Sequence, residues 1–189
     1  MKKVITDYLN QASMNFKLLD RESNNIEKSA NIIIKALKNN NKIIFCGNGG
    51  SAADSQHLAA ELMGRYKLNR DPLAAMSLTV DTSAITAIGN DYGYDKVFSR
   101  QLEGIGNKND VLYATSTSGA SKNVIEAAKK AKDLGIYVIG VTGENNAELS
   151  DLSDVSINAP SKETNHIQEM HIAIGQLICG IVENYFFEK

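Results

Sequence analysis

The stretch with the clearest chemical content joins a glycine turn to a histidine and a carboxylate. An apolar run over residues 42–46 ends in Gly-Asn-Gly-Gly-Ser at 47–51, and a helical pattern follows at once. A strand, a glycine turn and a helix N-terminus form an anion site, because unpaired backbone N–H groups and the positive helix end converge there. Within that helix His57 and Glu61 are four residues apart, which places both on one face. These residues predict an anion cradle beside a candidate acid–base pair.

Simpler interpretations of this stretch stay open. The turn matches neither the dinucleotide-binding motif nor a Walker A loop, and no lysine follows the glycines. Glycine turns follow the first strand in many α/β folds, and a His–Glu pair at this spacing is often only a surface hydrogen bond. Ser51 with Asp54 forms a variant of the capping box, which predicts that the helix starts there.

A second loop of the same kind carries hydroxyl side chains. Residues 115–121, Thr-Ser-Thr-Ser-Gly-Ala-Ser, follow a predicted strand, and Ser121 stands where the next helix begins. Hydroxyls and N–H groups at a helix N-terminus suit a phosphate monoester, although a Ser/Thr-rich segment can be only a turn. Open α/β sheets bind ligands at the carboxyl ends of their strands. We therefore expect the two loops to hold the phosphate and the body of one sugar phosphate.

Composition and charge narrow the class of protein. The 189 residues suffice for one domain, and 43% hydrophobic with 22% charged residues is typical of a globular protein. A formal charge of −2 and a pI near 5.9 argue against broad binding to nucleic acid or membrane surfaces. Polar residues follow Met1-Lys2-Lys3, so we expect no signal peptide, and no apolar run approaches the roughly 20 residues of a membrane span. Cys46 and Cys179 lack metal-motif spacing, which favours reduced core residues of a cytoplasmic protein.

Alternating strands and helices must position these loops. Apolar runs predict strands over residues 42–46, 72–78, 110–114, 136–141 and 155–157. Helical patterns are expected over 3–20, 23–38, 51–64, 82–88 with Asp81 as its cap, 97–105, 121–134, near 149, and 161–186. The alternation implies right-handed βαβ units and a buried parallel sheet. We expect an α/β fold, a three-layer α/β/α sandwich with a parallel five-stranded, flavodoxin-like sheet. It forms a single domain over 1–189, with extra helices over about 1–40 and the core over about 41–189.

Four short motifs carry a family resemblance. They are CGNGGSAAD at 46–54, GNDYGY at 89–94, TSTSG at 115–119 and IQEMH at 167–171. In this order they resemble the bacterial phosphoheptose isomerases of the sugar isomerase (SIS) domain superfamily, from about residue 20 onward. The resemblance implies a homotetramer with active sites at subunit boundaries and N-terminal helices used in oligomerisation. It also implies interconversion of sedoheptulose 7-phosphate and D-glycero-D-manno-heptose 7-phosphate.

The resemblance assigns roles to individual residues. Glu61 matches the catalytic base, and His57, Glu61 and Gln168 match zinc ligands, so zinc is the implied cofactor. The implied phosphate-binding residues are Ser116, Thr117, Ser118 and Ser121. The implied sugar-lining residues are Asn48, Gly49, Gly50, Ser51, Asn90, Asp91 and Gln168. Aldose–ketose isomerisation suits this set, because it needs a base to move a proton between adjacent carbons and a metal or donors to stabilise the enediolate.

One position departs from the family pattern. Gln176 stands where the family has a second catalytic and zinc-binding histidine. Glutamine can donate a hydrogen bond or offer a weak carbonyl ligand, but it cannot carry a proton near neutral pH. Gln168 and Gln176 are about 12 Å apart along one helix, so we expect different subunits to complete each metal site. We also expect weak or absent zinc binding, and a packing or hydrogen-bonding role for His171.

Other functions compete with this interpretation. A non-catalytic SIS-fold protein would bind sugar phosphates, or would associate with the replication initiator DnaA as some tetrameric relatives do. Those relatives lack the carboxylate at the position of Glu61, so its presence with His57 favours an enzyme. An isomerase acting on another ketose or aminosugar phosphate also stays open. The pathway served, whether lipopolysaccharide, capsule or surface-layer glycan, is not fixed by these residues.

Overall fold

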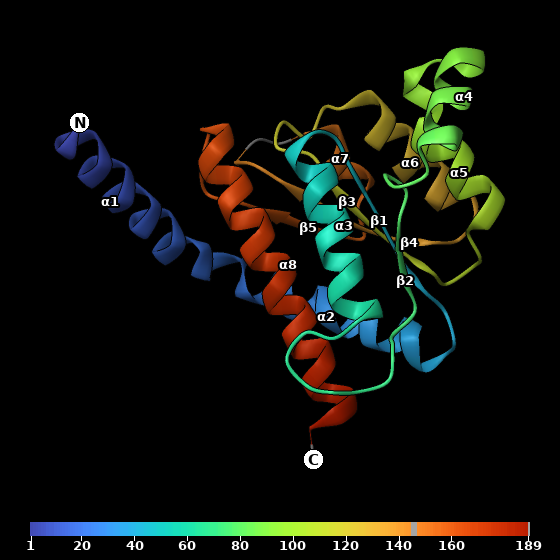
Figure 1. The fold of residues 1–189 in the computed structure, drawn as a ribbon, viewed down its shortest axis with the longest axis horizontal. Coiled ribbons are helices and arrows are strands. Elements are labelled where there is room, and N and C mark those ends of the chain that lie inside the picture. Colours follow the sequence, from blue (N-terminus) through green and yellow to red (C-terminus); the bar gives the residue numbers. More distant parts are fainter. Residues whose placement is uncertain (145–146, 189) are drawn as a thin grey trace.

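A computed structural model describes residues 1–144 and 147–188, and in these residues a five-stranded parallel sheet forms the centre of the chain (Figure 1). The strands are β1 (Ile43–Gly47), β2 (Ala75–Ser77), β3 (Val111–Thr115), β4 (Tyr137–Thr142) and β5 (Val155–Asn158). Their order is β2-β1-β3-β4-β5, and every neighbouring pair is parallel. The predicted α/β fold class and the parallel, flavodoxin-like sheet are confirmed.

Two layers of helices enclose this sheet. The α-helices are α1 (Lys2–Leu18), α2 (Ser23–Lys38), α3 (Gly50–Met63), α4 (Thr82–Tyr92), α5 (Val97–Ile105), α6 (Lys122–Asp133), α7 (Glu148–Leu152) and α8 (Thr164–Phe187). Two 3₁₀ turns, η1 (Leu19–Glu22) and η2 (Tyr94–Lys96), join neighbouring helices. Successive residues of a strand point to opposite faces. Accordingly Ile43 and Phe45 pack with α2, α3 and α8, whereas Ile44 and Cys46 pack with α5, α6 and α7.

The predicted strands match the observed ones closely, except at one sheet edge. Strand β2 covers only Ala75–Ser77 instead of 72–78, because it is an edge strand that pairs with β1 alone. The two cysteines are free and buried, as expected for core residues.

The start of α3 differs from the prediction. The helix begins at Gly50 with Gly49 as its N-cap, and no side chain caps it, so the predicted Ser51–Asp54 capping box is wrong. Gly49 has φ 56°, a backbone conformation that glycine adopts readily and other residues avoid. This tight turn starts the helix earlier than Ser51. Ser51 instead lies buried inside the first turn, where its carbonyl accepts a hydrogen bond from the Ser55 hydroxyl at 2.8 Å.

The end of α4 also differs from the prediction. Asp81 caps its start as expected, with Oδ1 accepting a hydrogen bond from the Ala84 N–H at 2.9 Å. The helix does not stop at Gly89 but continues to Tyr92 and ends at Gly93, whose φ is 87°. A single glycine weakens a helix without ending it, whereas a positive φ does end it. Asn90 and Asp91 therefore lie in the last helical turn and not in a loop.

The first and last helices have contrasting environments. Helix α1 extends away from the body (Figure 1), and its apolar residues Val4 and Leu9 are 69% and 61% exposed. Helix α8 is long and apolar enough to cross a membrane by length and composition, contrary to our expectation that no segment would be. Its residues Ile167, Ile174 and Val182 are buried against the sheet and neighbouring helices, so its apolar face belongs to the core of the domain.

Candidate active site

The two predicted ligand loops lie side by side at the carboxyl ends of β1 and β3. Gly47 at the end of β1 pairs with Thr115 at the end of β3. The chain continues from β1 to the outer strand β2 and then crosses to β3, so the strand order reverses between these two loops. This is the switch point at which open α/β sheets bind ligands. The fold thus brings the glycine turn and the hydroxyl loop together, as the sequence predicted.

The hydroxyls of the second loop converge. The Ser116 Oγ lies 3.0 Å from the Ser121 Oγ and 3.4 Å from the Ser118 Oγ. Ser121 is the N-cap residue of α6, yet its side chain makes no capping bond and is turned toward Ser116. Gly119 turns the loop with φ 63°, where a Cβ atom would lie 2.2 Å from the Ala147 Cβ. The result is a cluster of hydroxyls beside the positive end of a helix, which suits a phosphate group.

An asparagine pair connects the two loops. The Asn48 Nδ2 donates to the Asn123 Oδ1 at 2.8 Å, and the Asn123 Nδ2 donates to the Asn48 Oδ1 at 2.8 Å. The Tyr94 hydroxyl also donates to the Asn48 Oδ1, at 3.2 Å. Sequence analysis did not find Asn123 or Tyr94, because 75 residues separate the two asparagines and no periodic pattern marks the pair. Tyr94 nevertheless lies inside the motif at 89–94.

The remaining sugar-lining candidates lie in two places. Asn90 donates to the Asp91 Oδ1 at 2.8 Å, and both are exposed at the end of α4. Among the described residues no hydrogen bond joins this pair to either loop. Tyr94, just beyond the pair, makes that connection. Gly49 and Gly50 are exposed at the start of α3, so their backbone groups are accessible to a ligand.

The predicted acid–base pair forms on α3. The His57 Nε2 lies 2.9 Å from the Glu61 Oε1, and their side chains are 48% and 18% exposed. Asp54 lies one turn before His57, and burial raises the pKa of its carboxyl while the nearby His57 lowers it. The pair therefore presents an imidazole and a carboxylate together on the accessible side of the helix.

Gln168 does not join that pair within one chain. A Cβ atom on Gly50 would lie 2.3 Å from the Gln168 Nε2, and one on Gly175 would lie 2.3 Å from the Leu58 Cδ1. Helices α3 and α8 therefore run side by side in the same direction, with Gln168 level with Gly50. At about 1.5 Å per residue, Glu61 is about 16 Å farther along α3. Gln168 thus reaches the glycine turn, whereas half-buried Gln176 lies farther along α8.

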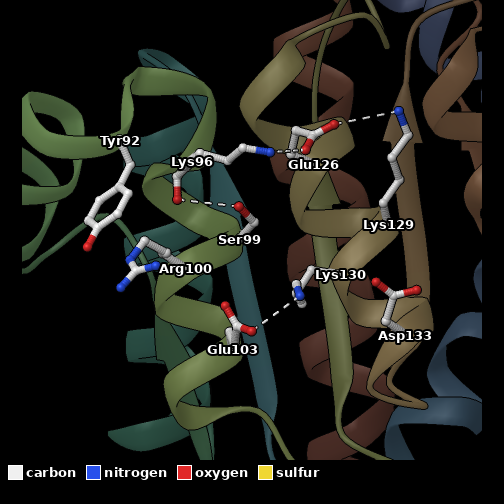
Figure 2. A pocket seen from close by; sticks show the side chains of 9 residues that line it. All are labelled: Tyr92, Lys96, Ser99, Arg100, Glu103, Glu126, Lys129, Lys130 and Asp133. Atoms are coloured by element: carbon white, nitrogen blue, oxygen red, sulfur yellow. Dashed lines mark hydrogen bonds and ion pairs between the residues drawn. The ribbon is translucent and has the colours of Figure 1, made fainter.

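A charged groove of about 390 Å³ lies between α5 and α6 (Figure 2). Lys96 is paired with Glu126, and Lys130 lies 3.4 Å from Glu103. The Arg100 guanidinium stacks 3.8 Å above the ring of Tyr92. Because most of its charged side chains pair with each other, we interpret the groove as a salt-bridged contact between the two helices. None of the predicted site residues lines it.

Comparisons with known proteins agree with this geometry. The SIS domain family model matches residues 7–143. The phosphoheptose isomerase of Akkermansia muciniphila is 51% identical over 187 residues, which cover 99% of each protein. The chain belongs to the phosphoheptose isomerase family of SIS-domain proteins.

Two solved structures of the phosphoheptose isomerase family share the fold. The enzyme from Neisseria gonorrhoeae is 39% identical, has a TM-score of 0.92 and is matched over 97% of this chain and 98% of its own. The enzyme from Francisella tularensis is 32% identical and has a TM-score of 0.93. The match covers 96% of this chain and 97% of that enzyme. Because these relatives are named enzymes and cover nearly the whole chain, the non-catalytic alternative is not favoured.

The zinc that the family resemblance implies does not fit the residues of a single chain. In residues 1–144 and 147–188 no group of three or more His, Cys, Asp or Glu side chains could hold a metal ion. His57 and Glu61 supply two donors, but structural and catalytic zinc sites need three or four protein ligands within about 2.3 Å. The Gln168 amide lies at the other end of α3. The described residues of one chain therefore cannot hold a catalytic zinc ion by themselves.

A buried ion pair fixes the backbone at Glu61 in this family member. The Arg70 Nε lies 2.9 Å from the Glu183 Oε2, and the two side chains are 2% and 1% exposed. Arg70 also donates to the carbonyl oxygens of Glu61 at 2.7 Å and Leu62 at 2.6 Å, which caps the C-terminal end of α3. Sequence analysis missed this pair; the only signal was an isolated glutamate within the apolar pattern of α8.

Glu183 stays charged inside the core because it is fully hydrogen-bonded. It accepts from the backbone N–H groups of Tyr66, Lys67 and Leu68 at 2.8–3.1 Å, besides Arg70. Burial raises the pKa of the Glu183 carboxyl, but these hydrogen bonds outweigh burial and hold the pKa below its ordinary value. The Arg70–Glu183 pair therefore joins α8 to the segment after α3. It stabilises the position of the end of α3 that carries Glu61.

Proposed function

We propose that this chain interconverts sedoheptulose 7-phosphate and D-glycero-D-manno-heptose 7-phosphate. The observation that carries the proposal is the convergence of the Ser116, Ser118 and Ser121 hydroxyls beside the glycine turn, at the switch point of the sheet. A phosphate monoester fits the hydroxyl cluster, and a short sugar chain fits the neighbouring turn. Family membership supplies the reaction class, an aldose–ketose isomerisation.

The phosphate is proposed to bind the hydroxyl loop. Ser116, Ser118 and Ser121 donate from side chains that already lie within 3.4 Å of one another. Thr117 completes the set; its carbonyl is engaged by the Gly143 N–H at 3.2 Å, which fixes the loop backbone. The N-terminal end of α6 adds a favourable field for the anion.

The sugar is proposed to extend from this loop across the glycine turn. Asn48, Gly49, Gly50 and Ser51 form its floor, and Gln168 covers the start of α3. Asn90 and Asp91, in the last turn of α4, are proposed to contact the sugar from that side. Polar groups from three segments thus surround a chain of hydroxyls, as recognition of a sugar requires.

Proton transfer is assigned to Glu61. Its carboxylate removes the proton from C2 of the aldose and returns it to C1, while a proton passes from the C2 hydroxyl to the C1 carbonyl oxygen. His57, 2.9 Å away, orients the carboxylate. Gln176 occupies the second catalytic position and can hold the sugar oxygens by hydrogen bonds but cannot carry their proton.

The complete site is proposed to need two copies of the chain. In one copy Gln168 lies beside Gly50, far along α3 from the His57–Glu61 pair. The proposed assembly is a homotetramer. In it, the helices of residues 1–40 from one copy cover the exposed apolar side chains of α1 in another copy. A zinc ion shared by His57, Glu61, Gln168 and Gln176 of different copies would be held weakly or not at all.

The cellular role follows from the product. A heptose phosphate made in the cytoplasm supplies lipopolysaccharide, capsule or another heptose-containing surface glycan. Nucleic acid and membranes are not proposed as partners, because the formal charge is −2 and the apolar face of α8 is packed in the core.

Turnover of sedoheptulose 7-phosphate by the purified protein tests this function. We expect the aldose product to appear, observed by NMR, and to be lost when Ser118 and Ser121 are both changed to alanine. Ser83→Ala, which removes an exposed hydroxyl outside both loops, should leave the rate unchanged. Absence of product with the folded parent protein would refute the proposal, and full activity of the double variant would refute the role of the hydroxyl loop.

A further inference from the structure

We infer that Asn123 and Tyr94 are positioning residues that commit the Asn48 side chain to a single role, donation of one N–H to an oxygen of the substrate. The inference rests on the proposed function, in which Asn48 lines the sugar. It follows from three hydrogen bonds that meet on one amide: two with Asn123, both 2.8 Å, and one from the Tyr94 hydroxyl, 3.2 Å.

The count of donors and acceptors on Asn48 leads to this role. A primary amide has two N–H donors and one oxygen with two lone pairs. One N–H of Asn48 is given to Asn123, while its oxygen accepts from both Asn123 and Tyr94. Both lone pairs are thereby occupied, and one N–H is left. Asn48 is half-buried at the end of β1, beside the glycine turn, and we assign this remaining N–H to an oxygen of the ligand.

Asn123 can hold this orientation because its own position is fixed. Asn123 is only 3% exposed and belongs to the first turn of α6. That turn is set by Ser121, whose carbonyl accepts from the Val124 and Ile125 N–H groups, each at 3.0 Å. The reciprocal amide pair therefore ties the glycine turn to the start of α6 and the adjoining hydroxyl loop.

Tyr94 brings a third segment to the same amide. It begins the 3₁₀ turn η2 directly after Gly93, whose φ of 87° redirects the chain at the end of α4. Its hydroxyl reaches Asn48 across 46 residues of sequence, although Tyr94 is 59% exposed. The end of α4, the glycine turn and the start of α6 thus share one hydrogen-bonded junction.

This junction bears on the class of sugar accepted. A hydroxyl or carbonyl oxygen can accept the free N–H of Asn48. A protonated amino group has only donors and would find no free lone pair on the amide. The structure therefore favours sugar phosphates with oxygen substituents at the contacted carbon and disfavours the corresponding aminosugar phosphates.

A double-mutant cycle separates positioning from a general structural role. We expect Asn123→Ala and Asn48→Ala each to lower kcat/KM for sedoheptulose 7-phosphate, and the double variant to be no worse than Asn48→Ala alone. Inhibition by inorganic phosphate should be unchanged, since the hydroxyl loop is intact. Additive losses in the double variant would overturn the inference. Asn123→Asp keeps the acceptor for Asn48 and loses the donor, so its kcat/KM should lie between those of the parent and of Asn123→Ala. This variant replaces Asn123→Ala in the test if the alanine variant does not fold.

Tyr94→Phe gives a second test at an exposed position. We expect it to lower kcat/KM about five-fold, the effect of one hydrogen bond, and to weaken discrimination against aminosugar phosphate inhibitors, because one lone pair of Asn48 is freed. Tyr92→Phe is the matched control, since Tyr92 contacts Arg100 instead of Asn48. Equal behaviour of the two variants would overturn the assignment of Tyr94. A parent that turns over the substrate confirms the proposed function whatever the variants do, whereas a folded parent that neither binds nor converts it overturns both.

Discussion

The side-chain amide of Gln168 lies directly over Gly50, so closely that a Cβ atom at position 50 would be 2.3 Å from the Gln168 Nε2. This contact fixes where α8 meets α3. It places Gln168 at the glycine turn, where it can contact the sugar, and separates it from Glu61 in the same chain. In the proposed function, a second copy therefore supplies the base to the sugar.

Adding one methyl group at this contact should disturb the site more than the fold. We predict that Gly50→Ala lowers kcat/KM at least ten-fold, because the methyl group displaces the Gln168 side chain. The melting temperature should change little, since the displaced atoms belong to the end of a flexible side chain. Gly104→Ala in α5 is the matched control: nothing lies within 4 Å of its added Cβ, and alanine favours the helix. Equal activity of both variants would show that Gln168 does not act at the glycine turn.

The Arg70–Glu183 pair should dominate the stability of the α3–α8 junction. We predict that Glu183→Gln lowers the free energy of unfolding by about 3–5 kcal/mol, because it leaves the buried Arg70 charge uncompensated. Urea denaturation at pH 7 measures this loss. Lys130→Gln, which breaks an exposed pair with Glu103, should cost less than about 1 kcal/mol. A loss for Glu183→Gln as small as that of the control would contradict the account.

The Arg70–Glu183 pair should also affect how the free energy of unfolding depends on pH in acid. The folded-state pKa of Glu183 is held below its ordinary value of 4.5, so the unfolded chain binds the proton more readily. The stability it contributes is complete above pH 4.5 and is lost as the pH falls through the lower, folded-state pKa. The Glu183→Gln variant should therefore lose stability less steeply below pH 4.5 than the parent does.

On acidification, His171 should cause a separate loss of stability that begins at a higher pH than the loss due to Glu183. It is buried, and its Nε2 donates to the Thr142 carbonyl at 2.9 Å; burial lowers its pKa from 6.5 to about 4. Because the unfolded chain takes up a proton that the folded chain refuses, stability should decrease as the pH falls from 6.5 to 4. At about 1.4 kcal/mol for each pKa unit, the full effect is about 3 kcal/mol. His171→Gln, which keeps a donor but does not titrate, should flatten the slope; an unchanged slope would contradict this.

Gln176 should limit both zinc binding and rate. We predict that Gln176→His raises zinc occupancy and increases kcat by about 10² or more, because imidazole is a stronger zinc ligand and can carry a proton. Metal analysis and turnover of both forms at equal concentration test this. A parent that already carries stoichiometric zinc and turns over as fast as the histidine form would show that Gln176 is no defect.

Local patterns predicted most of the fold and the loops of the site. Strands β1 and β3 read as apolar runs because both faces of the sheet are covered, and Ser116, Ser118 and Ser121 are close in sequence as well as in space. The start of α3 was misplaced because the sequence does not reveal that Gly49 adopts a positive φ.

The contacts that hold the site in place could not be predicted in the same way. Asn48 and Asn123 are 75 residues apart, and Arg70 and Glu183 are 113 apart. Such pairs have no periodic signature, since they exist only after the strands and helices have packed. The same packing decides that Gln168 meets Gly50 and not Glu61.

Activity of mixed oligomers tests most directly whether this is an isomerase whose site joins two copies. Glu61→Gln removes the base, the Ser118→Ala and Ser121→Ala double variant removes phosphate binding, and each protein alone should be inactive on sedoheptulose 7-phosphate. When the two are co-expressed with different tags and isolated as mixed oligomers, we predict that about a quarter of the parent rate returns, because some sites combine two intact halves. Mixed oligomers as inactive as either variant alone, beside an active parent, would contradict the account.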